Sequence, residues 1–347
     1  MFAMRTLSAL GLALSLGLTA TAGAETTIRV LSDRTPAHLE SLFKHYEQIN
    51  GVKIEAVFVK KGLLARLKER PTEADLVITS TGDVLQEAKQ EGLLRKYESK
   101  TIDATLAAEF RDPDDTYVTM NYRPRVIFAS RERVKPGEVT GYADLVDPKW
   151  RGRVCVRSGY HEYNLSFLSQ MAADKGLDAT RSFIGGLKEN LARTPNGNDR
   201  NQVRGIYEGV CDIALANSYY MPIMMSNPEQ RPWGEATYVI FPDQDKGGAY
   251  VMRGTAGLTT AGDHVAEATK LLEYLVSKEG QEFVVNTTFE YPALAGVALP
   301  EAVRDLGKGQ PGIEDGRFKA RFIAMPQVTP QRDAVVTMLD EINFDSK

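Results

Sequence analysis

Hydrophobic residues in the first part of the chain alternate between the spacing of a strand and the spacing of a helix. The β-branched run 27–31 predicts a strand, and the apolar residues at 39, 42, 43 and 46 then mark one face of a helix. The same order repeats, with strands expected at 54–59 and 76–78 and helices at 63–67 and 84–93. This alternation is typical of an α/β domain with a largely parallel sheet.

A strand expected at 126–129 ends this region, and a second alternation begins beyond it. The last helix is expected to have Thr329 as its N-cap and Pro330 at its first position, followed by apolar residues from Val335 to Ile342 at helical spacing. Between these points we expect strands at 154–156, 211–216, 237–241 and 250–252, and helices at 165–173, 180–191, 200–207 and 265–276.

These elements predict two α/β lobes with a cleft between them. We expect residues 25–125 to form the first part of lobe 1, residues 126–249 to form lobe 2, and residues 250–347 to return to lobe 1 and add C-terminal helices. Clefts between domains are a preferred place for ligands. The alternative at this point is a single large α/β enzyme domain.

The first 24 residues have the pattern of a secretory signal peptide. Arg5 is their only charge, an apolar stretch runs from Leu7 to Leu18, and the small residues at 22–24 form a cleavage site of the A-x-A type. The apolar stretch is shorter than the roughly 20 residues that span a bilayer. We therefore expect export and cleavage after Ala24, with an uncleaved membrane anchor as the alternative.

The charge balance argues against a nucleic-acid partner. With 42 Lys and Arg against 46 Asp and Glu, the formal net charge is −4, so there is no basic excess for a phosphate backbone or an anionic membrane surface. Beyond the N-terminal segment, no stretch of the sequence is long and apolar enough to span a bilayer. We therefore expect neither nucleic-acid binding nor direct membrane insertion.

Cys155 and Cys211 are the two cysteines of the sequence. An oxidising compartment favours a disulfide between such a pair. Closing the loop between them would stabilise the fold by roughly 3 to 4 kcal/mol on the chain-entropy model. The alternative is two separate buried thiols, since cysteine is a common core residue.

Known catalytic signatures are absent from the sequence, whereas an adjacent pair of tyrosines stands out. No G-x-S-x-G, H-E-x-x-H or G-x-x-x-x-G-K-[ST] motif occurs, and His161-Glu162 lacks the second histidine of a zinc-binding helix. Tyr219 and Tyr220 follow an expected strand, at the edge where open α/β sheets bind ligands. Both can face one site only if the strand has ended by Asn217, and a purely structural role for the pair is the alternative.

A series of short motifs runs through most of the chain. In order they are Arg123-Pro-Arg125-Val126, Asp144-Leu-Val-Asp-Pro-Lys-Trp-Arg-Gly152, Cys155-Val-Arg-Ser-Gly159, Tyr163-Asn164, Gly197-Asn-Asp199, Gly209-Val-Cys-Asp-Ile-Ala-Leu-Ala-Asn-Ser-Tyr-Tyr220 and Glu290-Tyr-Pro292. This ordered set resembles the periplasmic ferric-iron-binding proteins of ABC importers. A set of several spaced motifs is far more specific than any one of them.

The resemblance implies a two-lobed, type II solute-binding fold, in which each lobe is a mixed, mainly parallel sheet flanked by helices and Fe(III) lies in the interlobe cleft. It also implies metal ligation by Tyr219, Tyr220 and a third tyrosine at Tyr163, with Tyr160 as a weaker candidate. The chemistry agrees, because Fe(III) prefers anionic oxygen and a phenol of pKa about 10 becomes a phenolate when a metal displaces its proton.

Some members of this family hold a synergistic anion such as carbonate beside the iron. Arg34 and Arg123 match the positions that resemble anion holders, and Arg125 shares a face with Arg123 if the segment is extended. A structural ion pair is the alternative for each arginine.

The first lobe departs from the pattern of many relatives. Where they carry His-Tyr or Glu ligands, this chain has Thr35-Pro36 and Ser80-Thr81. The first lobe is therefore expected to supply no strong side-chain ligand unless His38 reaches the metal.

The leading hypothesis is a monomeric periplasmic protein that delivers Fe(III) to an inner-membrane ABC permease without chemical change. One alternative keeps the fold and replaces the cargo with a small anion or an organic solute such as a phosphonate, thiamine or a polyamine. The other is a secreted hydrolase that uses His161 and Glu162.

Overall fold

A computed structural model describes residues 26–346, so the predicted signal peptide at 1–24 lies outside the described residues. The strands are β1 Thr27–Ser32, β2 Lys53–Phe58, β3 Leu76–Thr79, β4 Tyr117–Ser130, β5 Val154–Cys155, β6 Ile213–Asn217, β7 Thr237–Ile240, β8 Ala249–Leu258, β9 Tyr291–Pro292 and β10 Ala320–Arg321. The α-helices are α1 Glu40–Asn50, α2 Leu63–Glu69, α3 Gly82–Gln90, α4 Lys100–Thr105, α5 Glu162–Lys175, α6 Leu177–Asn190, α7 Asp199–Tyr207, α8 Tyr220–Ser226, α9 Arg231–Glu235, α10 Val265–Val276, α11 Lys278–Thr288, α12 Glu301–Arg304, α13 Met325–Val328 and α14 Arg332–Ile342. Over the described range, no helix has the length and apolar character needed to cross a membrane.

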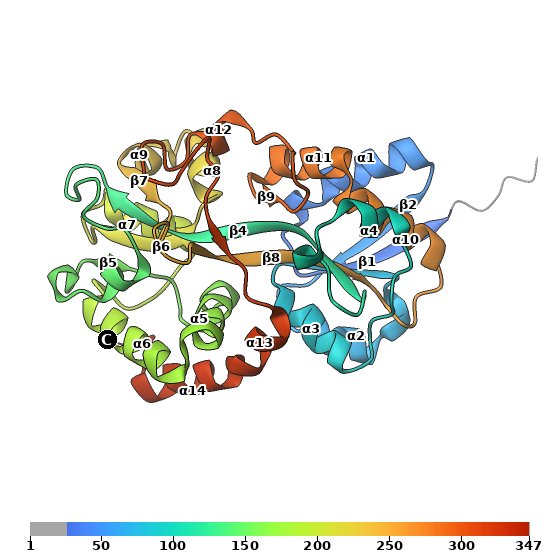
Figure 1. Cartoon of the computed structure of the whole chain (residues 1–347), viewed down its shortest axis with the longest axis horizontal. Coiled ribbons are helices and arrows are strands. Elements are labelled where there is room, and N and C mark those ends of the chain that lie inside the picture. The colour runs from blue at the N-terminus through green and yellow to red at the C-terminus, as the bar shows by residue number, and fades with distance from the viewer. Residues whose placement is uncertain (1–25, 347) are drawn as a thin grey trace, which may run out of the picture.

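Two long strands, β4 and β8, join two lobes (Figure 1). The strand order is β2-β1-β3-β8-β4-β6-β5, with β7 and β9 also paired to β4 and β10 to β8. The pairs β1–β2, β1–β3 and β5–β6 are parallel, whereas β4 is antiparallel to each of its neighbours. Because β4 pairs with β8 up to Pro124 and with β6 from Arg125, a single strand passes from one lobe into the other.

Separate hydrophobic clusters fill the two lobes. The first lobe buries Ile28 and Ile78 together with Leu271 of α10. The second lobe buries residues of β4 and β6, and it also takes in Val303 of α12 and Leu339 of α14. After residue 250, residues of β8, α10 and α11 contribute to the cluster around Ile28, whereas residues of α12 and α14 contribute to the clusters around β4 and β6. The exact lobe boundaries at 125/126 and 249/250 stay a prediction.

Most of the expected strands and helices are present, but the predicted N-cap of the last helix is wrong. Thr329 is not the N-cap of the last helix, because its backbone is already helical and it opens a 3-10 turn with Pro330. That turn links α13 to α14, which begins only at Arg332. A proline fits the first turn of a 3-10 helix as well as that of an α-helix. The sequence therefore predicts a helical turn correctly at Pro330 but assigns it to the last α-helix instead of to the 3-10 turn before it.

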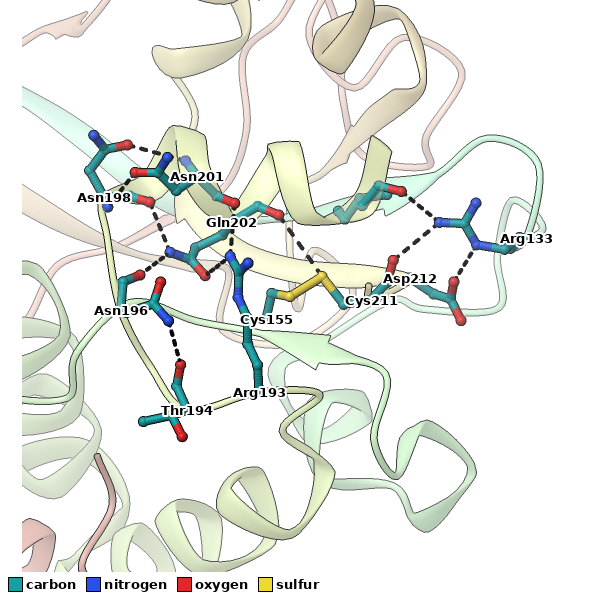
Figure 2. Close-up of a disulfide and its surroundings, with 11 residues drawn as sticks. Arg133, Cys155, Arg193, Thr194, Asn196, Asn198, Asn201, Gln202, Cys211 and Asp212 are labelled. Carbon is teal, nitrogen blue, oxygen red and sulfur yellow. Dashed lines mark hydrogen bonds and ion pairs between the residues drawn. A yellow bond between two sulfur atoms is a disulfide. The ribbon is translucent and has the colours of Figure 1, made fainter. Parts of the chain in front are cut away.

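The predicted disulfide between Cys155 and Cys211 is confirmed (Figure 2). Cys155 ends β5 and Cys211 precedes β6, and these two strands are parallel neighbours. The Cα atoms of the two cysteines are 5.9 Å apart, within the usual range for a disulfide. The disulfide therefore joins β5 to β6. β5 leads into the loop before α5, and β6 leads into α8.

Candidate metal site

The adjacent tyrosines lie where a strand turns into a helix. β6 ends at Asn217, Tyr219 has helical backbone angles, and α8 begins at Tyr220. Successive side chains on a helix are about 100° apart instead of pointing to opposite faces as in a strand. Both rings can therefore face the same space, and their centroids are 4.3 Å apart.

The third predicted tyrosine reaches the same place from another element. Tyr163 lies in the first turn of α5, and this turn is fixed by His161, whose Nδ1 accepts a hydrogen bond from the Tyr163 backbone amide. The Tyr219 hydroxyl lies 3.4 Å from the Tyr163 hydroxyl. The structure thus brings together three phenol groups from two helix starts, and their role as metal ligands stays a prediction.

The environment of Tyr219 and Tyr220 keeps these two phenols protonated in the absence of a metal. Burial raises the pKa of Tyr219 well above its ordinary value, and the neighbouring phenols of Tyr163 and Tyr220 add to the shift, while Arg123 opposes it. Burial likewise raises the pKa of Tyr220. A cation that binds to these oxygens must displace their protons, and only a strong Lewis acid does this readily.

Arg34 and Arg123 share one carboxylate near the tyrosines. Glu290, just before β9, is buried, and its carboxylate lies 2.7 Å from the Arg34 guanidinium and 3.6 Å from that of Arg123. Asn121 donates a further hydrogen bond of 2.6 Å to it. Burial raises the pKa of Glu290, but the two arginines outweigh it and hold the pKa below its usual value. Two positive charges therefore share one negative charge beside the phenols.

Arg123 also connects the two lobes at the site. Its guanidinium carbon lies 5.2 Å from the centre of the Tyr163 ring, and it donates a hydrogen bond to the carbonyl of Ser80. Ser80 is held by Asp33, which accepts hydrogen bonds from its amide and its hydroxyl. A cation at about 5 Å from an aromatic centre is within the range of a cation–π contact.

His38 is the one first-lobe histidine that comes near the tyrosines. Its ring stands edge-on to Tyr219 with 6.3 Å between centroids. Burial, with the positive charge of Arg34, lowers the pKa of His38 to about 4, so its imidazole is neutral at neutral pH. A neutral imidazole is the form that binds metals.

Two other predicted residues have different surroundings. Tyr160 is 37% exposed, and its hydroxyl donates a 2.6 Å hydrogen bond to Asp340 of α14, so it helps to hold that helix. Arg125 is fully buried, and its guanidinium lies 2.5 Å from Asp199. Arg125 does share a face of β4 with Arg123, but it is enclosed within the second lobe.

Three residues around the site received no role from the sequence. Glu290, Asp199 and Arg157 all lie in the quoted motifs, but a motif does not show which group from a distant segment a side chain faces. Arg157 is the third: its guanidinium carbon lies 5.3 Å from the centre of the Tyr163 ring, and it pairs with Asp199 at 3.3 Å. An arginine two residues after Cys155 carries no local sequence signal for such a contact.

The residues of the hydrolase alternative have structural partners. The His161 side chain caps α5, and burial lowers its pKa to about 4. Glu162 points to Arg332 of α14, which contacts both of its carboxylate oxygens at 2.9 Å. Arg332 also lies 3.7 Å from the buried Asp83 of α3, so it bridges the two lobes. We call these three residues, Asp83, Glu162 and Arg332, the cross-lobe clasp.

A large cavity elsewhere lacks the chemistry of the tyrosine site. It has a volume of about 1420 Å³ and lies in the second lobe between β7, α8 and the loop 305–311. Apolar side chains such as Met221, Ile240 and Leu306 contribute to its lining. We place the candidate metal site at the three phenols, because they offer convergent oxygen donors, whereas no cluster of carboxylate, histidine or cysteine side chains suited to a metal occurs among the described residues.

Comparison with known proteins confirms the resemblance. Residues 72–311 match the family model described as bacterial extracellular solute-binding protein. The chain is 31% identical to iron uptake protein A1 of a Synechocystis strain, over 93% of this chain and 89% of that protein.

Solved structures agree with the sequence relatives. The fold superposes with a TM-score of 0.85 on the apo ferric ion-binding protein A of Pasteurella haemolytica, at 32% identity and with 92% of this chain and 99% of that one covered. It superposes with a TM-score of 0.82 on the Trichodesmium protein IdiA (FutA) in complex with iron and citrate, at 27% identity and with 92% and 99% covered. The two-lobed type II fold is thereby confirmed, and the chain belongs to the bacterial extracellular solute-binding protein family.

Proposed function

We propose that the protein binds Fe(III) between its lobes through the phenolate oxygens of Tyr163, Tyr219 and Tyr220. The observation that carries this proposal is the convergence of three tyrosines from the starts of α5 and α8, with 3.4 Å between the Tyr163 and Tyr219 hydroxyls. Three phenolates balance the charge of one Fe(III), and hard anionic oxygen is the donor type that this ion prefers. His38 is a neutral nitrogen donor within reach of the same place on lobe closure.

Unpaired guanidinium groups beside the phenols support a bound anion. Arg34 and Arg123 share the carboxylate of Glu290, yet the buried Nε and Nη1 of Arg123 and the Nε of Arg34 have no hydrogen-bond partner among the described residues. An oxyanion is the kind of ligand that would pair with such donors. We propose carbonate or a carboxylate anion in this position, held by Arg34 and Arg123. Arg125, whose guanidinium is enclosed with Asp199, is assigned a different role below.

The transport role follows from the proposed cargo and the family. We propose that the mature protein is a periplasmic monomer that passes iron to an inner-membrane ABC permease and catalyses no reaction. The names of the relatives support iron as cargo, and they include an iron uptake protein and a structure with iron and citrate.

The test is the visible spectrum of the protein loaded with Fe(III) in bicarbonate buffer. The wild-type protein is expected to show a phenolate-to-iron charge-transfer band, and the variant with Tyr219→Phe and Tyr220→Phe together is expected to lose it. Tyr160→Phe is the matched control, because it removes a hydroxyl that contacts Asp340 and should leave the band intact. A wild-type protein without the band, or a double variant that retains it in full, would contradict the proposal.

A titration of metal-free protein distinguishes the other cargo. Tight binding of a phosphonate, thiamine or a polyamine by a protein that does not take up Fe(III) would favour the organic-solute alternative. Under our proposal such solutes leave the iron titration unchanged.

A further inference from the structure

A buried carboxylate connects the segments that carry the three tyrosines. Asp199, at the first position of α7, is fully buried and lies 2.5 Å from the Arg125 guanidinium and 3.3 Å from that of Arg157. It also accepts a 2.9 Å hydrogen bond from the backbone amide of Asn217. Its partners therefore come from the second half of β4, the loop before α5 and the end of β6.

Each partner of Asp199 is close in sequence to a site residue or touches one. Asn217 is two residues before Tyr219, and Arg157 lies against the ring of Tyr163. Asp199 therefore connects the turn that carries Tyr219 to Arg157, whose guanidinium contacts the ring of Tyr163.

Arg125 adds a second connection between the same two segments. It donates hydrogen bonds to the side-chain oxygens of Asn164 at 2.6 Å and of Asn217 at 3.0 Å. Asn164 follows Tyr163, and its amide nitrogen donates to the carbonyl of Arg157 at 3.0 Å. The two guanidinium groups and the carboxylate thus link the start of α5 to the turn before α8.

We propose that Asp199 is a positioning residue of the metal site, which sets the distance between Tyr163 and the Tyr219-Tyr220 pair. This inference rests on the proposed function. A buried carboxylate whose two oxygens are both paired holds its partners in one geometry, since a displacement leaves a buried charge unpaired. Partners of metal ligands act in this way in other metal sites, where they orient the ligands.

Asp212 offers a matched control at the start of β6, the strand that ends at Asn217. Asp212 precedes β6 and, like Asp199, pairs with two arginines, Arg133 and Arg153, as Figure 2 shows for Arg133. It stands in the same lobe, and none of its partners contacts a tyrosine of the site. Loss of its charge should therefore perturb the stability of the lobe and leave the tyrosine geometry unchanged.

The first experiment compares Asp199→Asn with Asp212→Asn by competition of Fe(III) against citrate and by the charge-transfer spectrum. We expect Asp199→Asn to lower the affinity about 10- to 100-fold, the range seen when a partner of a metal ligand is lost, and to shift the band. Asp212→Asn should keep both, even if it unfolds at a lower urea concentration. Equal losses in the two variants, or an Asp199→Asn variant within twofold of wild type with an unshifted band, would overturn the proposal.

Two further measurements decide the matter independently of the first. If Asp199→Asn does not fold, Arg157→Gln is the substitute, because it removes the longest contact of Asp199. We expect it to shift the charge-transfer band in the same direction, and an unshifted band would count against the proposal. The crystal structure of metal-free Asp199→Asn tests the positioning without iron, because the 3.4 Å between the Tyr163 and Tyr219 hydroxyls is expected to widen. An unchanged distance overturns the inference, whereas a wild-type protein without a charge-transfer band refutes the proposed function alone.

Discussion

The carboxylate of Glu290 is the resident counter-ion of Arg34 and Arg123, and its removal is the most direct test of the electrostatics at the site. The substitution Glu290→Gln keeps the size of the side chain and an acceptor for Asn121 but removes the charge. In the structure this charge lies 2.7 Å from one guanidinium and 3.6 Å from the other, and all three side chains are buried. The variant therefore leaves two buried cations without the carboxylate that they share.

The magnitude follows from these distances. At an effective dielectric constant of 20, each contact represents about 5 kcal/mol of gross attraction, most of which offsets the cost of taking the charges out of water. Removal of one partner from a buried pair costs about 3–5 kcal/mol of folding free energy, because the remaining charge stays buried. We expect a loss of this size for the metal-free protein.

The assay is urea unfolding of the metal-free variant and the wild type, followed by circular dichroism, with and without bicarbonate. Bicarbonate should raise the unfolding midpoint of the variant more than that of the wild type, because the two arginines then lack their own carboxylate. Glu279→Gln is the control, since Glu279 pairs with His45 at 60% side-chain exposure and such surface pairs contribute about 0–1 kcal/mol. A loss below about 1 kcal/mol and no added response to bicarbonate would refute the reasoning.

Three other predictions concern the rest of the molecule. Arg332→Met breaks the cross-lobe clasp, so the metal-free variant should have a larger radius of gyration in small-angle X-ray scattering; an unchanged radius would show that the clasp does not resist opening. Replacing Cys155 and Cys211 together with Ala should lower the free energy of unfolding by about 4 kcal/mol, measured by urea titration, and an effect near zero would contradict the chain-entropy argument. Burial opposes ionisation of Asp75, but hydrogen bonds from the Arg29 side chain and backbone outweigh it and hold the pKa of Asp75 well below its usual value. This carboxylate therefore stabilises the fold above about pH 4 and loses its contribution as the pH falls further, so Asp75→Asn should flatten the decline of stability below pH 4.

The sequence predicts the alternating elements of both lobes but only short pieces of the strands between them. It indicates 126–129 of β4 and 250–252 of β8, whereas the structure extends them to Tyr117–Ser130 and Ala249–Leu258. The missed parts carry polar residues and glycines in place of apolar alternation. A side chain at Gly254 would lie 2.0 Å from Asn121 and 2.7 Å from Arg34, so the strand pattern is interrupted where the charged groups of the site pack closely.

Local patterns identify the candidate tyrosines better than they assign the arginines. Tyr219 and Tyr220 follow a strand with a clear end, and this places them at a sheet edge without knowledge of the rest of the chain. Strand alternation puts Arg123 and Arg125 on one face, which is correct, but their carboxylate partners come from segments more than 70 residues away. The alternation of side chains along a strand shows which face a residue points to, but it contains no information about a partner that is distant in sequence.

The position of β8 in the sheet has a consequence for how the protein folds. β8 lies between β3 and β4, with Thr79 opposite Thr255, so the first lobe cannot complete its sheet until residues near 255 are available. Its folding depends on contacts between parts of the chain that are distant in sequence, which is the property that slows folding. Neither lobe corresponds to a continuous fragment, and a truncated chain that ends before β8 would expose the edges of both β3 and β4 to other chains.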